Sequence, residues 1–221
     1  MKLGKLAVAV AAIVAIGSAQ ASIIDNGTYT TDTVSGLDWL DVTRTAGMSF
    51  NTVLSEIAVG GTLYGWRYAT ADQLAELVNG LPITYTSNIP IPSVSSYARV
   101  TGSDRIILDG LTTSLGITFS NSIYASHDRV NGLTADAMST NSPYHYISTF
   151  ESVDHNLAGY HFSQVSFRDS YQHSTLSNES VGSFLVRDTA ISPVPAPPAV
   201  ILMLAGLGLL GLTKRFRKEV G

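Results

Sequence analysis

Cysteine is absent from the 221 residues of this chain. A disulfide scaffold, a zinc–thiolate site, a cysteine nucleophile and a CxxC redox motif are therefore all excluded. Charge is also scarce, since Asp, Glu, Lys and Arg together make up 14% of the residues. The long hydrophobic runs lie at the two ends of the chain, so the ends and the middle differ in composition.

The first 21 residues have the three parts of a secretory signal peptide. Two lysines give a basic start, and an apolar run follows over Leu6–Ile16. Ala19 and Ala21 then supply the small residues of a cleavage site. The apolar run is too short for a stable membrane span. We therefore predict that residues 1–21 are a signal peptide and that the protein is exported, with an N-terminal membrane anchor as the alternative.

The C-terminal end also has three parts. Residues 193–198 form a proline-rich hinge, which favours an extended spacer. Residues 199–213 are apolar, and we predict a transmembrane helix there, although at ~1.5 Å per residue it falls short of a ~30 Å hydrocarbon core. Residues 214–221 form a basic tail that is expected to stay in the cytoplasm. The basic side chains of this tail are Lys214, Arg215, Arg217 and Lys218.

This C-terminal arrangement resembles the PEP-CTERM sorting signal of Gram-negative bacteria. The motif Val194-Pro195-Ala196-Pro197, the apolar run and the basic end carry the resemblance. Ala196 stands where the family has Glu, which is closer to a variant that reads V-P-x-P-A. The resemblance implies a membrane intermediate, processing by an exosortase, and a place beside extracellular polysaccharide. An ordinary single-span anchor is the alternative.

Between these ends, residues 22–192 form one exported domain that is long enough for a sizeable core. The domain contains seven Arg, no Lys and sixteen Asp and Glu, and seven minus sixteen gives a net charge of −9. This charge argues against nucleic-acid binding and against docking on anionic lipids. Ser and Thr are abundant, which is typical of a β-rich exported protein with polar strand faces. O-glycans or hydrogen bonds to a polysaccharide are the alternative.

Local signals predict a hairpin and two helices in the first part of the domain. The turn at Ser35-Gly36 is expected to join strands over residues 28–33 and 37–42. Ser49 is expected to cap a helix that runs to about residue 59. The capping box from Thr70 to Gln73 predicts a second helix that ends near Asn79.

For the rest of the domain, the sequence predicts a loop and short strands. Residues 81–97 contain three prolines and many Ser and Thr, so we expect a loop. Short strands are predicted over residues 105–108, 117–124, 144–150, 161–167 and 183–187. We therefore predict an α+β fold, with two N-terminal helices packed on short, mostly antiparallel strands.

Three segments resemble exported bacterial domains related to the Lcl C-terminal family, which resemble the C-type-lectin-like fold of formylglycine-generating enzymes. Residues 65–77 match the family's GWR-LPT-xxEL segment, residues 36–41 its early GLxWL strand, and residues 182–188 its closing strand. Tyr68-Ala69 replaces the family's Leu-Pro. The resemblance implies a C-type-lectin-like fold. Formylglycine-generating activity is excluded by the analogy, because that activity uses Cys.

Trp39, Trp66 and Arg67 are structural landmarks within these segments. The two tryptophans are the only ones in the chain, and each would bury a large area against a strand or helix. Arg67 has candidate partners in the nearby carboxylates. We interpret the cluster as core architecture and not as a ligand site.

Candidate catalytic and metal-binding groups are few. Glu151, Asp154, His155 and His161 are residue types that suit a divalent metal, and the last three suggest an envelope hydrolase. The chain has no HExxH, GxSxG or DxDxDG motif, however. The metal ligands therefore stay unknown, and we predict no cofactor.

Two weaker groupings complete the candidates for chemistry. His127 beside Asp128 is the start of a hydrolytic triad, and calcium has carboxylate ligands available at Asp104 with Asp109, or at Asp128 with Asn131.

A late cluster of aromatic and imidazole side chains suits carbohydrate stacking, but we favour the simpler interpretation that these side chains alternate between the two faces of strands, with half of the rings in the core. The cluster consists of Tyr144, His145, Tyr146, Tyr160, His161, Tyr171 and His173.

From these observations we predict an exported, non-catalytic protein of the envelope or surface, sorted by its C-terminal signal and associated with extracellular polysaccharide. One alternative is a glycan- or calcium-binding module on a C-type-lectin-like scaffold. The other is an envelope hydrolase.

Overall fold

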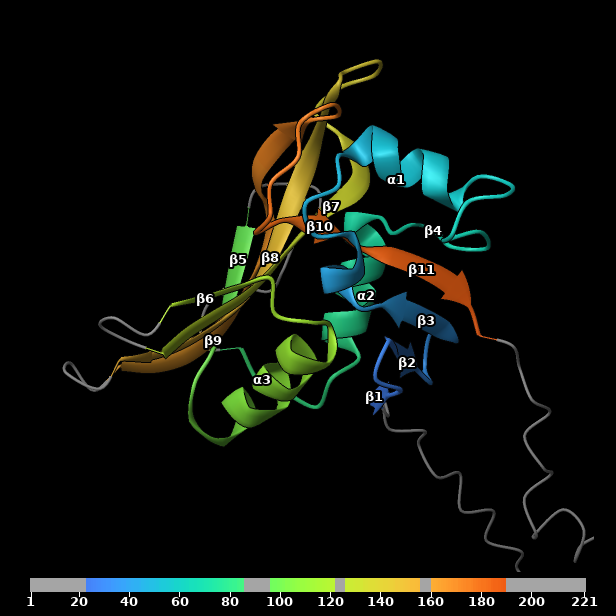
Figure 1. The fold of residues 1–221 in the computed structure, drawn as a ribbon. Helices are drawn as coiled ribbons and strands as arrows, with labels where there is room; N and C mark the ends of the chain where they lie inside the picture. The colour runs from blue at the N-terminus through green and yellow to red at the C-terminus, as the bar shows by residue number, and fades with distance from the viewer. Residues whose placement is uncertain (1–22, 86–95, 122–125, 156–159, 190–221) are drawn as a thin grey trace, which may run out of the picture. The chain divides into compact units, whose positions relative to one another are not determined.

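The computed structural model describes residues 23–85, 96–121, 126–155 and 160–189 (Figure 1). The predicted signal peptide, hinge, transmembrane segment and basic tail all lie outside these residues. So do the cleavage-site residues Ala19 and Ala21 and the motif Val194–Pro197. The chain divides into two compact units, Met1–Thr189 and Ala190–Gly221, and the described residues all belong to the first.

Antiparallel β-sheet dominates the domain, and the predicted fold of two helices packed on short strands is wrong. Of the described residues, 44% are in strands and 23% are helical. The longest strands are β7 (Ser126–Ala137), β8 (Tyr144–His155) and β9 (Tyr160–His173), which pair as an antiparallel meander. No helix within the described ranges is long and apolar enough to cross a membrane.

The smaller sheet joins the two ends of the domain. Its order is β1-β2-β3-β11-β4, and all of its strands pair antiparallel. The predicted hairpin is confirmed, with Gly36 at a φ of 69° in the turn between β2 and β3, a value that glycine adopts readily. These strands are β1 (Ile23–Asp25), β2 (Tyr29–Asp32), β3 (Leu37–Leu40), β4 (Arg67–Tyr68) and β11 (Leu185–Asp188).

The larger sheet has the order β10-β7-β8-β9-β5, with β6 also paired to β7. Strand β10 (Gly182–Ser183) is parallel to β7, whereas β5 (Ser96–Val100) and β6 (Phe119–Asn121) pair antiparallel with their neighbours. Because β10 is followed at once by β11, the chain passes here from the larger sheet to the smaller one.

The described residues of the domain form three α-helices, two of which the sequence predicts. Helix α1 (Phe50–Ile57) begins at the Ser49 cap, and α2 (Ala71–Asn79) begins with the expected capping box. Helix α3 (Arg105–Ser114) occupies a segment predicted as a strand, so that prediction is wrong. The buried residues Leu108, Leu111 and Thr112 of α3 follow helical spacing. Two 3₁₀-helices, Val42–Thr45 and Gly102–Asp104, complete the elements.

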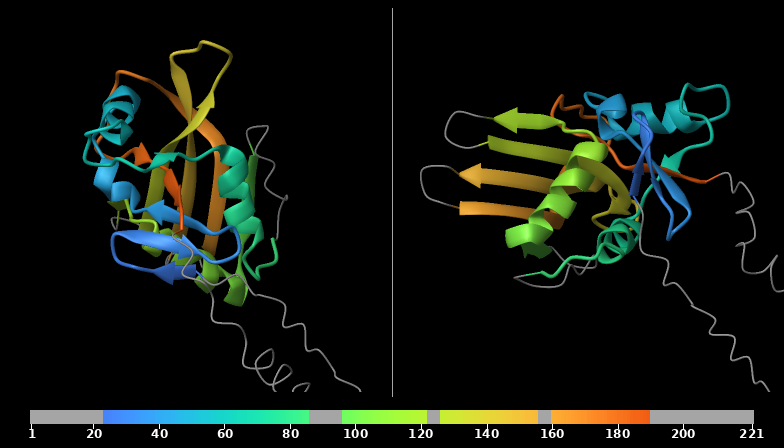
Figure 2. Two further views of the ribbon diagram at one scale, coloured as in Figure 1. Left: turned by 90° about the vertical axis from the view of Figure 1, so that its right-hand side faces the viewer. Right: turned by 90° about the horizontal axis from the view of Figure 1, so that it is seen from below.

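Two hydrophobic clusters hold these elements together. The larger one joins both sheets to α2 and α3, and the smaller one packs α1 against the larger sheet and β11. Figure 2 shows α3 lying along one face of the larger sheet. The largest fully buried side chains of the larger cluster are Trp39, Leu74, Leu77, Leu108, Leu115, Phe150, Phe167 and Phe184.

We expect Gly132→Ala to destabilise the domain by about 1–3 kcal/mol, the usual cost of overpacking a core. A Cβ at Gly132 would lie 2.5 Å from a ring carbon of the buried Phe184. The matched control is Gly110→Ala in α3, where a Cβ has no neighbour within 4 Å and the gain in helix propensity is about 0.5–1 kcal/mol. Urea unfolding measures both changes. Equal midpoints for Gly132→Ala and the unmutated protein would contradict the described packing between the two sheets.

Candidate functional site

The candidate site lies on the face of the larger sheet that is turned away from α3. On the α3 side, Ser163 donates a hydrogen bond to Asp109, and Asp154 lies 3.8 Å from Arg105. Because successive side chains of a strand point to opposite faces, their sequence neighbours point away from α3. We call this the open face. Its residues are Tyr97, Arg99, Phe119, His127, Arg129, Asn131, Thr149, Glu151, Val153, Phe162 and Gln164.

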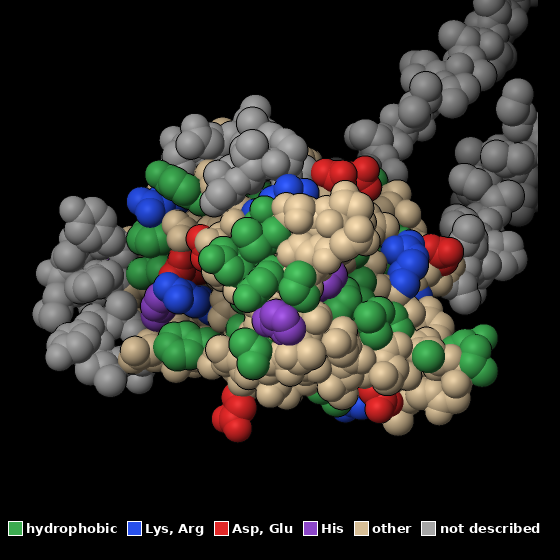
Figure 3. All heavy atoms as spheres, turned by 90° about the horizontal axis from the view of Figure 1, so that it is seen from above, with side chains coloured by type: hydrophobic (Ala, Val, Ile, Leu, Met, Phe, Trp, Pro, Cys, Tyr) green, Lys and Arg blue, Asp and Glu red, His purple; other side chains and the backbone are tan. Residues whose placement is uncertain are grey.

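Figure 3 shows the domain from above, and the open face lies in the left part of that picture. Basic, acidic and histidine side chains lie there next to one another, among hydrophobic side chains.

A carboxylate network occupies the centre of the open face. Arg129, Glu151 and Gln164 lie directly opposite one another on β7, β8 and β9. Arg129 donates to Glu151 Oε1 through both Nε, at 2.9 Å, and Nη2, at 2.7 Å. His127 Nε2 contacts the same oxygen, and Gln164 Nε2 donates to Oε2. Glu151 therefore has partners on both of its oxygens.

Burial and partners act in opposite directions on the pKa of the Glu151 carboxyl. The residue is only 6% exposed, and this burial raises the pKa. The hydrogen bonds and charges of Arg129 and His127 outweigh the burial, so the net pKa lies below its ordinary value. Glu151 is thus an ionised anion with its acceptors occupied, which suits it to orient its neighbours and not to abstract a proton.

The network continues toward β5, at the edge of the sheet. Arg99 Nη2 donates to Gln164 Oε1 at 3.4 Å, and its guanidinium lies 3.9 Å from the centre of the Phe162 ring. On the opposite side, Phe119 meets the His127 ring edge-to-face, with 6.3 Å between ring centres. Aromatic rings therefore flank the charged centre on two sides.

A cavity of about 360 Å³ adjoins this network. It forms where the open face meets the segment that returns from β9 to β10. Asn131 ties that segment to the sheet, because its Nδ2 donates to the Ser180 carbonyl at 3.0 Å and its Oδ1 accepts from Thr149 Oγ1 at 3.0 Å. The cavity is lined by Phe119, Arg129, Asn131, Ile147, Thr149, Asp169, Ser170, Asn178, Ser180 and Val181.

The lining combines apolar and polar surfaces in the way that binding sites for small polar molecules do. Ile147 and Val181 are buried apolar side chains, and Phe119 adds an aromatic wall. Asp169, Ser170 and Asn178 supply exposed hydrogen-bonding groups. The volume is near the lower end of the ~300–1,000 Å³ that is typical of ligand sites. The cavity therefore fits a small polyhydroxylated group by burial and hydrogen bonding.

Of the predicted metal and hydrolase residues, the structure brings together Asp154 and His161, but not Glu151. Glu151 lies on the open face, whereas Asp154 lies on the α3 side, where it contacts His161 and Arg105. The side chain of His155 is outside the described part of the chain. Over the described ranges, no three His, Asp or Glu side chains gather in a way that would hold a metal ion.

The weaker groupings are also separated. Asp128 is next to His127 in β7, so the two side chains point to opposite faces. Asp104 accepts a hydrogen bond from the Thr84 amide at 2.9 Å. Asp109 instead pairs with Arg105 at 3.2 Å.

The aromatic and histidine cluster is divided between the two faces of the sheet. Tyr144, Tyr171 and His173 lie together, with ring centres 5.6 and 5.1 Å apart and nearly perpendicular rings. His145 lies on the opposite face and stacks on Phe50 of α1 at 3.5 Å. Burial lowers the pKa of His145, so the neutral ring is favoured within this stack.

The other members of that cluster lie at different points along β8 and β9, with Tyr146 opposite Tyr171 in the strand register. Tyr146 lies under the guanidinium of Arg168, 4.9 Å from it. Tyr160 and His161 belong to the far end of β9, and His161 contacts Asp154 there.

The tryptophan landmarks lie in the smaller sheet and its surroundings. Trp39 is 1% exposed in the larger core cluster, on β3. Trp66 packs under the guanidinium of Arg187 at 4.4 Å. Arg67 pairs with Asp188 at 3.3 Å on the surface, and not with its candidate partners Asp38, Asp41 and Asp72.

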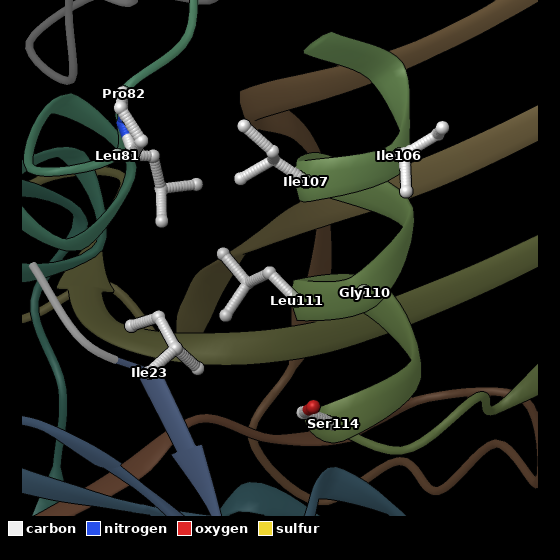
Figure 4. Close-up of a pocket in the computed structure, with 8 residues that line it drawn as sticks. All are labelled: Ile23, Leu81, Pro82, Ile106, Ile107, Gly110, Leu111 and Ser114. Carbon is white, nitrogen blue, oxygen red and sulfur yellow. The ribbon is translucent and has the colours of Figure 1, made fainter. Parts of the chain in front are cut away.

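A second cavity, of about 320 Å³, lies between α3 and the strand end at Ile23 (Figure 4). Leu81, Ile107 and Leu111 point into it, whereas Ile106 points away. Ser114 is the only lining side chain with a polar group. The cavity therefore offers little that would orient a polar ligand.

Sequence reasoning missed the roles of Arg129, Gln164, Phe119 and Asp169. His127, Asn131 and Glu151 were selected, but for other partners. Residues 126 to 129 of β7 are all polar and Val130 is the first apolar residue, so no alternation in the sequence marks the face that carries Arg129.

Comparison of the chain with protein-family models, with curated proteins and with solved structures found no match in any of the three.

We expect Glu151→Gln to cost about 1–3 kcal/mol at neutral pH, because Arg129 and His127 lose a buried charged partner. The cost stays below that of a fully buried pair, since the Arg129 side chain is 39% exposed. Asp188→Asn is the matched control, because its pair with Arg67 is on the surface and is worth about 0–1 kcal/mol.

The pH dependence of the free energy of unfolding tests the same ion pairs in a second way. The pKa of Glu151 is lowered on folding. The stability that its carboxylate contributes is therefore fully present above the pKa of the unfolded state, about 4.3, and is lost as the pH falls through the pKa of the folded state. The stability difference between Glu151→Gln and the unmutated protein should therefore shrink as the pH is lowered below about 4. A difference that stays constant in urea unfolding at each pH would refute the described ion pairs.

Proposed function

We propose that this is an exported, non-catalytic protein of the cell envelope or surface, and that it binds extracellular polysaccharide in the cavity of the open face. An exosortase-type enzyme processes its C-terminal segment after a membrane intermediate. Nucleic acid is not a partner, because the domain is acidic and lacks Lys.

The observation that carries the binding proposal is the cavity beside the Glu151 network. Polysaccharides present hydroxyl groups around apolar C–H faces, and the lining offers matching surfaces in Phe119, Ile147 and the polar rim. The Glu151 network and the Asn131 bonds hold the lining in place before a ligand arrives. Such pre-organisation lowers the entropy cost of binding.

The proposal of export and sorting rests on the two ends of the sequence. The apolar run before Ala19 and Ala21 supports export, and the motif Val194–Pro197 with the basic end supports sorting. An acidic domain rich in Ser and Thr suits a hydrated extracellular matrix.

We expect Phe119→Ala to weaken polysaccharide binding on the order of tenfold, because it removes the aromatic wall of the cavity. Affinity electrophoresis through gels that contain neutral polysaccharide measures the change. Tyr64→Ala is the control, since Tyr64 is 65% exposed and lies in the connection after α1. Equal retardation of both variants, with unchanged melting temperatures, would contradict the proposal that polysaccharide binds in the cavity.

The mature protein from the envelope and the culture medium should have an intact mass that ends near the proline-rich hinge, without residues 199–221. Processing at that point is what a sorting signal requires. Mass spectrometry of both fractions tests it. A mature mass that retains Lys214–Lys218 would show that the C-terminal segment is not removed, and the proposed sorting step would then be wrong.

A further inference from the structure

We propose that the cavity of the open face selects neutral sugars and rejects carboxylated or sulfated ones. This inference rests on the proposed polysaccharide binding and names the class of sugar. It follows from how the charges of the lining residues are compensated.

The positive charge in the lining is already neutralised within the protein. Among the described residues that line the cavity, Arg129 is the one with a basic side chain, and two of its nitrogens donate to Glu151. The charge of the guanidinium is compensated by Glu151, so it attracts a sugar carboxylate less than an unpaired arginine would.

The negative charge in the lining is not neutralised. Asp169 is exposed at the rim, and the ion pairs within the described ranges do not include it. A carboxylate or sulfate in the cavity would meet this like charge at short range. The net charge of −9 on the domain repels a polyanion at longer range as well.

The same rim suits hydroxyl groups. The two oxygens of Asp169 accept hydrogen bonds, and a pair of adjacent sugar hydroxyls supplies two donors. The Asn178 Oδ1 already accepts from the Ser180 amide at 2.9 Å, which leaves its NH₂ group as a donor for a ligand. Ser170 adds a hydroxyl that both donates and accepts. Neutral sugars match this set without bringing a charge.

The test compares the unmutated domain with Asp169→Asn on two groups of polymers, at about pH 8 and low salt. The neutral group is a glucan, a galactan and a mannan, and the anionic group is alginate and polygalacturonate. We expect the unmutated protein to bind at least one neutral polymer and neither anionic one. Asp169→Asn should weaken the neutral binding several-fold, because one of the two acceptor oxygens and the negative charge are lost, and should bind a polyuronate at least tenfold more tightly than the unmutated protein does.

Asp188→Asn is the matched control, because it removes the same charge from the smaller sheet, away from the cavity. It should leave both groups of polymers unchanged. If it admits the polyuronates as well as Asp169→Asn does, the net charge is responsible and the inference is wrong.

The remaining outcomes separate the inference from the proposed function. Equal binding of neutral and anionic polymers by the unmutated protein would overturn the inference and leave polysaccharide binding intact. Failure of Asp169→Asn to admit polyuronates would do the same. If no polymer binds to any variant, the proposed function fails and the inference fails with it.

Discussion

The register among β7, β8 and β9 is the constraint on which the rest of the domain depends. It places Phe150 and Val165 in the core and sends Glu151 and Gln164 to the open face. Because the side chains alternate, a slip of one residue would move each of these to the wrong side. The core needs this register, and the open face follows from it.

The Glu151 network depends on this register in turn. An ionised carboxylate that is 6% exposed is tolerated only with charged and hydrogen-bonding partners. Those partners come from β7 and β9, and they are in reach only when all three strands are aligned. The network is therefore a consequence of the fold. It also disfavours misaligned pairings, because these would leave the buried Glu151 carboxylate without its partners at a cost in free energy.

Local parts of the fold were predictable because their causes lie within a few residues. The Ser49 cap and the capping box of Thr70 and Gln73 begin helices as expected. Strand β7 was missed because Gly132 interrupts its pattern, and a Cβ there would collide with Phe184, which is far away in sequence. Ile106 and Ile107 favour a strand, so the sequence predicts one at the start of α3, whereas the burial of Leu108 and Leu111 stabilises a helix there.

The candidate site was less predictable than the helices because its contacts join residues that are far apart in the sequence. Its central contacts join β7 to β8, 22 residues apart, and reach β9 another 13 residues on. The types of residue were visible in the sequence, but the alignment that makes Arg129 the partner of Glu151 was not. Asp154 and His161 do lie in contact, but grouping Glu151 with them ignores the two sides of a strand.

The wall of the cavity is tied to the junction between the two sheets. Asn131 holds the returning segment at Ser180, and the chain then enters β10 beside Gly132 and continues into β11 of the smaller sheet. Phe184, between those two strands, packs on Gly132 and on Phe150. The cavity wall therefore cannot shift without disturbing the packing that joins the sheets. Interiors packed at this density deform little, so the cavity keeps its shape for as long as the domain stays folded.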